Sequence, residues 1–261
     1  MAKFFPLFSS SQGNASFVGS KSSGVLVDAG ASCKKILNAL ACNEIDKTAV
    51  KGIFITHTHS DHIKGLKVLT KQLKVPVYAS ETTLEVLTHQ EQLAPDIQTI
   101  PINTNAIDCG DCEITAFPTM HDASGSVGYR IHTNDDRLCA VCTDLGIVTP
   151  EVKYALKGCD MVLLEANYEP AMLWNGMYPY ELKKRITSNY GHLSNQDSAE
   201  FADYLIRSGT TRLLLGHLSH HNNTPVLASK TVLQGLKDFK MNYDYLLGIA
   251  PAESTGGAVI F

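Results

Sequence analysis

Four side chains that can bind metal ions lie within six residues, at positions 57–62 of the stretch Thr-His-Thr-His-Ser-Asp-His. His57 and His59 are two residues apart, so in an extended chain they lie on the same side and can bind one ion. Asp61 and His62 follow at the expected start of a helix, from which they can turn toward a second ion. Burying three imidazoles and a carboxylate without a partner would be costly, so the spacing predicts a metal site.

Further candidate ligands stand where predicted strands end. Five such ends carry a His or an Asp and are expected to converge on one rim: Asp28, His57, His121, Asp144 and His217. His121 can complete the first ligand set, His217 the second, and Asp144 can bridge. The pattern predicts two cations about 3.5–4 Å apart that share a water or hydroxide, which Asp61 could orient or deprotonate.

The elements that must position these side chains alternate between apolar strands and amphipathic helices. Helices are predicted over 33–42, 62–73, 81–89, 178–187, 195–209 and 226–239. Strands are predicted over 15–20, 24–30, 52–57, 75–80, 112–117, 126–132, 137–144, 161–167, 212–217, 243–250 and 256–261. Apolar strands mixed with helices indicate an α/β protein in which helices cover a sheet, and we expect residues 1–261 to form a single domain.

The composition limits the possible partners. The net charge is −4, so no general basic field could hold a nucleic acid, and a polyanionic substrate would depend on metals and a few Lys or Arg residues. The N-terminus lacks the continuous apolar region of a signal peptide, and no run approaches the roughly 18 apolar residues that span a bilayer. We expect a cytoplasmic protein without a membrane partner, and the sequence identifies no protein partner.

Seven cysteines are present, an odd number that favours reduced thiols when no signal peptide is found. Two Cys-x-x-Cys pairs could together form a Cys₄ zinc site. We favour structural roles for these four cysteines over a zinc site. Cys109 and Cys112 flank a predicted hairpin turn, and Cys139 and Cys142 lie three residues apart on a predicted strand, where their side chains point to opposite faces.

The stretch at 56–62 resembles the His-x-His-x-Asp-His signature of the metallo-β-lactamase-fold hydrolases, and the later candidate ligands fall in family order along essentially the whole chain. The resemblance implies an αββα sandwich with a dinuclear metal site at one edge of the two sheets. It also implies how the residues divide: His57, His59 and His121 for the first metal, Asp61, His62 and His217 for the second, Asp144 as the bridge, and Asp28 as a support for the histidine loop. Such a donor set suits Zn²⁺, with Mn²⁺ and iron as alternatives.

His192 precedes a stretch in which Ser194 and Asp197 can cap the next helix. A helix N-terminus favours phosphate oxygens, and a histidine beside it could donate a proton to a leaving oxygen. With His217 placed 25 residues later, the pair resembles the phosphodiesterase branch of this fold, so we predict a catalytic role for His192. The remaining histidines are interpreted as surface or core residues: His89, His132, His220 and His221.

Three segments, over 9–18, 163–186 and 215–225, resemble the YycJ/WalJ (VicX) group of single-domain nucleases, which is associated with DNA 5′-exonuclease activity. Residues of the first segment could line the site, a basic cluster with a tyrosine in the second could grip a nucleic-acid backbone and stack a base, and two asparagines in the third are further candidates. The predicted substrate-binding residues are Ser11, Gly13, Asn14, Tyr178, Lys183, Arg185, Asn222 and Asn223. For the basic cluster, a solvated helix face is an equally good interpretation.

The spacing of the motifs leaves no room for two additions known in this fold. Only 72 residues separate Asp144 from His217, too few for a β-CASP domain, and the 22 residues between His121 and Asp144 leave no room for an arm that holds transfer RNA. We therefore predict a dinuclear metal-dependent phosphodiesterase, a 5′-to-3′ DNA exonuclease in which a metal-bridged hydroxide attacks phosphorus. The alternatives are an RNA or small-molecule phosphodiesterase, a thioester or lactone hydrolase, and a non-enzymatic metal-binding regulator.

Overall fold

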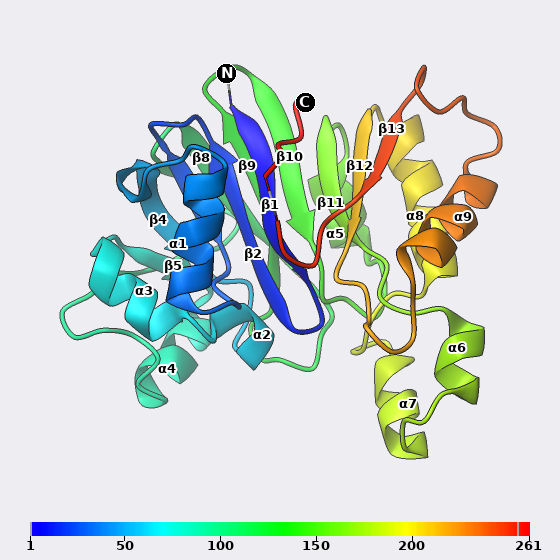
Figure 1. The fold of residues 1–261 in the computed structure, drawn as a ribbon, viewed down its shortest axis with the longest axis horizontal. Coiled ribbons are helices and arrows are strands. Elements are labelled where there is room, and N and C mark those ends of the chain that lie inside the picture. Colours follow the sequence, from blue (N-terminus) through cyan, green and yellow to red (C-terminus); the bar gives the residue numbers. More distant parts are fainter. Residues whose placement is uncertain (1, 255) are drawn as a thin grey trace.

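The computed structural model describes residues 2–254 and 256–261, in which two β-sheets pack face to face and helices cover the outer face of each (Figure 1). The first sheet has the order β1-β2-β3-β4-β5-β6, and the second has the order β13-β12-β11-β10-β9-β8-β7. This is the αββα sandwich that the family resemblance implies. Among the described residues, none of the helices combines the length and the hydropathy that a bilayer crossing requires.

The first half of the chain supplies the first sheet and its helices. Its strands are β1 (Lys3–Ser10), β2 (Gly13–Gly19), β3 (Gly24–Val27), β4 (Val50–Phe54), β5 (Val77–Ala79) and β6 (Thr99–Pro101). Its α-helices are α1 (Cys33–Cys42), α2 (Ser60–Ile63), α3 (Leu66–Leu73) and α4 (Glu81–His89).

The second half supplies the second sheet. Its strands are β7 (Ile107–Cys109), β8 (Cys112–Pro118), β9 (Val127–Thr133), β10 (Arg137–Cys142), β11 (Met161–Glu165), β12 (Arg212–Gly216) and β13 (Leu246–Ile249). Its α-helices are α5 (Pro150–Leu156), α6 (Pro170–Asn175), α7 (Tyr180–Ile186), α8 (Asn195–Arg207) and α9 (Pro225–Gly235). In Figure 1, α3 and α4 lie at the left, α1 overlaps the left-hand strands of the first sheet, α8 and α9 lie at the right, and α6 and α7 lie at the lower right.

Alternating side chains divide the apolar core into three layers. On β3, Val25 and Val27 pack between the two sheets, whereas Leu26 faces the helices of the first half. On β10, Val141 packs between the sheets and Ala140 faces α5, α8 and α9. Both faces of these strands are buried, which explains why they read as continuous apolar runs in the sequence.

Parallel pairing brings the ends of several strands to one edge of the sandwich. In the first sheet β3 pairs in parallel with β4, so that Val27 stands opposite Phe54. In the second sheet β10, β11 and β12 are parallel, and Cys142, Leu164 and Leu215 lie side by side. The residues that follow these positions therefore emerge together at the carboxyl ends of the strands.

The predicted helix over 62–73 is in fact two helices, α2 and α3, with a break at Gly65. The amide of Gly65 donates to the carbonyl of Ala29 at 2.8 Å, and a Cβ at this position would lie 2.1 Å from the carbonyl oxygen of Ala31. The chain turns here because it passes close to the loop after β3. The apolar period continues across the break, which is why the sequence pattern did not reveal it.

Several further elements differ from the sequence-based expectation. Strand β1 was not predicted because Pro6 interrupts its pattern, but it is an edge strand with a register shift between Pro6 and Phe8, where proline is tolerated. The expected strand over 256–261 is wrong, since only Val259 forms an isolated bridge, to Phe4. Helices α5 and α6, also missed, both begin with proline, and Thr149 caps α5.

The cysteines take the structural roles predicted for them. Cys109 and Cys112 flank a turn in which Gly110 has φ +62°, and they end and begin paired strands. Cys139 lies between the sheets and Cys142 faces the helices, so the two thiols of that pair point to opposite faces. All the cysteines are free.

Candidate metal centre

The loop after β4 and the short helix α2 carry four of the predicted ligands: His57, His59, Asp61 and His62. His57 is fully buried, His59 precedes α2 at its N-cap, and Asp61 and His62 lie in its single turn. The loops after β8, β10 and β12 bring His121, Asp144 and His217 to the same place. Ligand atoms lie within 4.8 Å of one another in each of four groups: His57, His59 and His121; Asp61, His62 and His217; His57, His62 and Asp144; and Asp144, Glu165, His192 and His217.

Three of the converging residues adopt left-handed backbone conformations within two residues of the ends of their strands. The φ angles are 63° at Asp28, 59° at Asp144 and 55° at His217. Residues other than glycine enter this region at a cost of order 1 kcal/mol, although Asp and His do so more readily than most. The turn at each strand end redirects the side chain from the sheet into the cluster.

Hydrogen bonds orient the histidines of the first group. The ring of His121 can donate from Nδ1 to the carbonyl of Gly191 at 3.0 Å, which leaves Nε2 free to face His59 Nδ1 at 3.2 Å. His57 Nδ1 lies 3.0 Å from the Thr56 hydroxyl. His57 and His121 therefore each have one nitrogen engaged with the protein, and His59 Nε2 lies 3.5 Å from Asp122.

Asp28 holds His62, a member of the group with Asp61 and His217, through the ring nitrogen that faces away from the cluster. It is 2% exposed, and one of its carboxylate oxygens accepts from the Thr56 amide at 2.9 Å. The other lies 2.8 Å from His62 Nδ1. His62 Nε2 consequently points at Asp144, with the facing oxygen atom 3.2 Å away. Asn14 adds a contact, with its Nδ2 3.0 Å from the same Nε2.

Glu165, at the end of β11, is a site residue that the sequence analysis missed. It is fully buried, and its Oε1 lies 2.7 Å from His217 Nδ1 and 2.8 Å from His192 Nδ1. Its other oxygen accepts from the amides of Leu145 and Leu193. The signal was present in the sequence, since a glutamate that closes an apolar strand needs buried partners.

The cluster fits divalent cations because it contains buried polar atoms that the protein does not satisfy. Among the described residues, His57 Nε2 and Asp144 Oδ2 have no hydrogen-bond partner of acceptable geometry, although His62 Nε2 lies near the latter. Buried atoms of this kind are uncommon in folded proteins. An imidazole nitrogen and a carboxylate oxygen directed into one cluster of ligands are what a cation such as Zn²⁺ or Mn²⁺ coordinates.

Burial and neighbouring charge move the histidine pKa values in opposite directions. Burial lowers the pKa of His57 well below its usual value. Burial also tends to lower the pKa of His62. The nearby carboxylates of Asp144 and Asp28 have the larger effect, and they hold the pKa of His62 well above its usual value. In the same way, the carboxylates around His217 overcome burial and raise its pKa to about 10. Without cations, protons balance these carboxylates, so cations that bind here would displace protons.

The predicted basic cluster is engaged within the protein. Lys183 donates to the carbonyls of Trp174 and Gly176 at 2.9 and 2.7 Å, at the end of α6. Arg185 forms an ion pair with Asp122, the residue after His121. Tyr178 packs near His221, with ring centroids 5.8 Å apart. The structure thus brings Arg185 next to the metal cluster, while Lys183 stabilises the junction of α6 and α7.

The other predicted substrate-binding residues divide between a surface and the interior. Ser11 and Gly13 line a cavity beside Asp61. Asn222 and Asn223 are 2% and 5% exposed, and the side chain of Asn223 donates to the carbonyl of Ala166 at 2.8 Å. These asparagines lie inside the loop after β12 and are not part of the cavity surface.

An αββα sandwich with a histidine and carboxylate cluster at one edge of its sheets defines a metal-dependent hydrolase of the metallo-β-lactamase fold. The solved structure of the metallo-β-lactamase fold protein YhfI from Bacillus subtilis covers 97% of this chain and 98% of its own, with a TM-score of 0.72 and 18% identity. The chain belongs to the β-lactamase superfamily, whose domain model matches residues 24–218.

Sequence similarity to individual proteins extends over almost the whole chain. The chain is 37% identical to exodeoxyribonuclease YycJ of Bacillus anthracis, over 90% of this chain and 89% of that protein. It is 35% identical to exodeoxyribonuclease WalJ of Streptococcus pneumoniae, over 90% and 88%. The resemblance to the YycJ/WalJ group that the sequence motifs indicate is therefore confirmed.

Proposed function

We propose that this protein is a dinuclear metal-dependent phosphodiesterase that removes nucleotides from the 5′ end of DNA. The observation that carries the proposal is the convergence of the predicted ligands and His192 on one edge, with buried His57 and Asp144 atoms directed at a common point. The names of the YycJ and WalJ relatives, both exodeoxyribonucleases, support DNA over RNA as the substrate. A cytoplasmic location remains a prediction from the sequence.

The family resemblance assigns His57, His59 and His121 to one cation and Asp61, His62 and His217 to the other, with Asp144 shared, and the proximity of these side chains supports that assignment. When bound, such a pair of cations acidifies a water molecule and neutralises charge on the phosphate. We propose Zn²⁺ or Mn²⁺ from the nitrogen-rich donor set.

Asp61 is placed to act on the attacking water. Its side chain is 21% exposed, more than that of any neighbour in its ligand group, and one carboxylate oxygen lies 3.3 Å from His217 Nε2. A carboxylate held in this way can orient a water molecule in the open part of the site and accept its proton.

His192 is placed to protonate the leaving oxygen. Its side chain is 19% exposed, and its Nδ1 is held by buried Glu165. With Nδ1 engaged, Nε2 is the atom that can carry a proton to the substrate. Its ring also lies beside those of His121 and His217, at centroid distances of 5.1 and 5.2 Å.

The proposal is tested with protein loaded with Zn²⁺ or Mn²⁺ and DNA labelled at either its 5′ or its 3′ end. We expect release of nucleotides from the 5′ end. His192→Ala should lower kcat about 10²–10⁴-fold while two metals per chain are retained. His132→Ala is a matched control, because this partly exposed histidine of β9 lies outside the candidate ligand groups and pairs with Asp136.

Intact DNA in the presence of two bound metals would contradict the substrate assignment, and RNA, small phosphodiesters and thioesters would then be assayed. Loss of metal from His192→Ala would contradict its role as an acid, since it would make the residue a ligand.

A further inference from the structure

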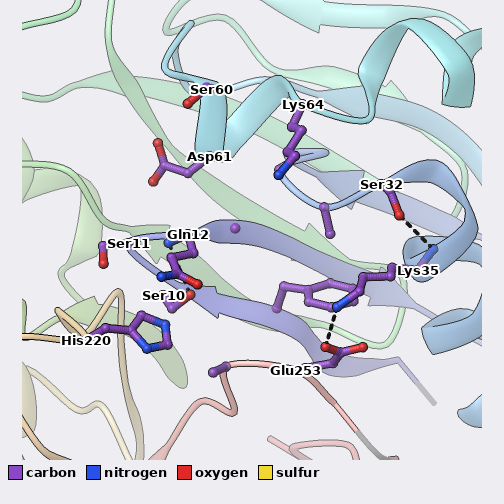
Figure 2. A pocket seen from close by; sticks show the side chains of 15 residues that line it. Ser10, Ser11, Gln12, Ser32, Lys35, Ser60, Asp61, Lys64, His220 and Glu253 are labelled. Carbon is purple, nitrogen blue, oxygen red and sulfur yellow. Dashed lines mark hydrogen bonds and ion pairs between the residues drawn. The ribbon is translucent and has the colours of Figure 1, made fainter.

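A cavity of about 620 Å³ opens beside the metal cluster, on the side of Asp61 (Figure 2). It is bounded by the β1–β2 turn, the start of α1, helix α2, the loop after β12 and the C-terminal segment near Glu253. Its volume lies within the range of about 300–1,000 Å³ typical of sites for one small ligand. The cavity therefore has room for the end of a strand at the metal cluster.

Two ammonium groups line this cavity, and of its two carboxylates Asp61 belongs to the proposed metal ligands and Glu253 pairs with Lys35. Lys35 of α1 and Lys64 at the end of α2 both line it, together with His220 and the hydroxyls of Ser32 and Ser60. Figure 2 shows Lys64 on the same side of the cavity as Asp61, and Lys35 directed at Glu253. The sequence analysis assigned neither lysine to the site, nor His220 or the two serines.

The two lysines differ in whether they already have a partner. Lys35 forms an ion pair with Glu253 at 2.7 Å, and both side chains are about half exposed, at 55%. Lys64 is exposed and has no ion pair within 4 Å in the part of the chain that the structure describes. Lys64 is thus the freer cation, and Glu253 is a carboxylate that an incoming anion would have to displace from Lys35.

We infer that this cavity binds the 5′-terminal phosphate of the substrate strand, with Lys64 as its principal partner and Lys35 as a second. The inference rests on the proposed exonuclease function. A terminal phosphate monoester carries a charge of about −1.5 to −2 at neutral pH, whereas each internal diester carries one negative charge. Two ammonium groups in a cavity that fits one ligand therefore favour the strand end over the continuous backbone.

The test compares two oligonucleotides of one sequence, one with a 5′-phosphate and one with a 5′-hydroxyl. For the metal-loaded wild-type protein we expect kcat/KM to be at least about tenfold higher for the phosphorylated strand. Lys64→Ala should reduce this ratio at least about fivefold, whereas Lys71→Ala, an exposed lysine of α3 outside the cavity, should keep it. Glu253→Gln, which frees Lys35, should raise the ratio about twofold.

A second measurement is the affinity for uncleavable phosphorothioate versions of both oligonucleotides, followed by fluorescence anisotropy. The preference for the 5′-phosphate should appear in Kd and should shrink as salt is added. A wild-type ratio near one, or an equal loss on both strands in Lys64→Ala, would overturn the inference while leaving the nuclease proposal intact. Absence of cleavage of either strand would instead overturn the nuclease proposal, and the anisotropy ratio would still decide whether the cavity recognises the phosphate.

Discussion

At the residue scale, the metal cluster depends on carboxylates that contact the Nδ1 atoms of its histidines and so leave the Nε2 atoms for the cluster. Asp28 contacts the Nδ1 atom of His62, and Glu165 contacts those of His192 and His217. Each contact fixes which ring nitrogen faces the cluster. The cluster is therefore specified by residues outside it as much as by its own members.

Asp28→Asn tests this support. An amide that keeps the bond from Thr56 presents its NH₂ group to His62 Nδ1, which must then give up its own proton or its position. We expect metal affinity to fall about 10–100-fold and the free energy of unfolding of the metal-free protein to fall about 1–3 kcal/mol. Competition with a chelating dye and urea unfolding measure the two effects.

Asp136→Asn is the control for this substitution. Asp136 also has a left-handed backbone, with φ 58°, and also pairs with a histidine, but it is exposed. Since asparagine tolerates this backbone region as well as aspartate does, both variants keep the chain geometry. Equal metal affinity in the two variants would show that the contact between Asp28 and His62 is unimportant.

Much of the candidate site could be predicted at this scale, because the residue types and the spacing of the histidines and aspartates are typical of metal ligands. The predicted ligands from His57 to His217 are residues that the structure brings together, because each follows an apolar strand whose end lies at the same edge of the sandwich. The sequence analysis missed Glu165 and Lys64 for different physical reasons. Glu165 was read as part of an apolar strand, and Lys64 resembles any exposed lysine until α1 and the C-terminal segment are placed around it.

At the element scale, the break between α2 and α3 positions the ligands Asp61 and His62. The Gly65 amide bonds to Ala29, so the end of α2 is held against the loop that follows Asp28. A continuous helix over 62–73, as the periodicity suggested, would carry these side chains elsewhere. Close contact between backbones is invisible to a pattern of apolar residues, which explains this error.

Gly65→Ala should therefore be strongly destabilising. The added methyl group would meet the Ala31 carbonyl at 2.1 Å, and because the obstacle is backbone, one of the two segments must move. We expect a loss of about 3 kcal/mol or more in the free energy of unfolding, with reduced metal content, measured by urea denaturation and metal analysis.

Gly248→Ala provides the comparison, since its nearest neighbour is the flexible end of Leu214, at 3.1 Å. A cost within about 1 kcal/mol is expected there. Similar losses for the two variants would show that the close approach at Gly65 does not constrain the chain.

At the scale of the whole molecule, the two sheets are joined by an aromatic group in the middle layer. Phe54 of the first sheet stacks on Tyr78 at 4.4 Å and meets the edge of Tyr129 from the second sheet at 5.5 Å. The Tyr129 hydroxyl crosses the interface and donates to the carbonyl of Ile55 at 2.6 Å. Ile55 lies two residues before His57, so this bond fixes the start of the histidine loop.

Tyr129→Phe removes that bond while it keeps the ring. We expect the free energy of unfolding to fall about 1–3 kcal/mol, because a buried carbonyl loses its side-chain donor. Tyr154→Phe is the control, since Tyr154 is 85% exposed on α5 and should change stability little. Equal urea midpoints for the two variants would contradict a role for the bond between the sheets.

The division of the chain into two halves has a further consequence. One half, with β1–β6, carries His57, His59, Asp61 and His62, and the other, with β7–β13, carries His121, Asp144 and His217. Each proposed cation would take ligands from both halves and so act as a cross-link between segments that meet through the middle core layer. The exposed loop at 103–106, between β6 and β7, is then the place where the chain could be cut into two fragments whose reassembly depends on metal.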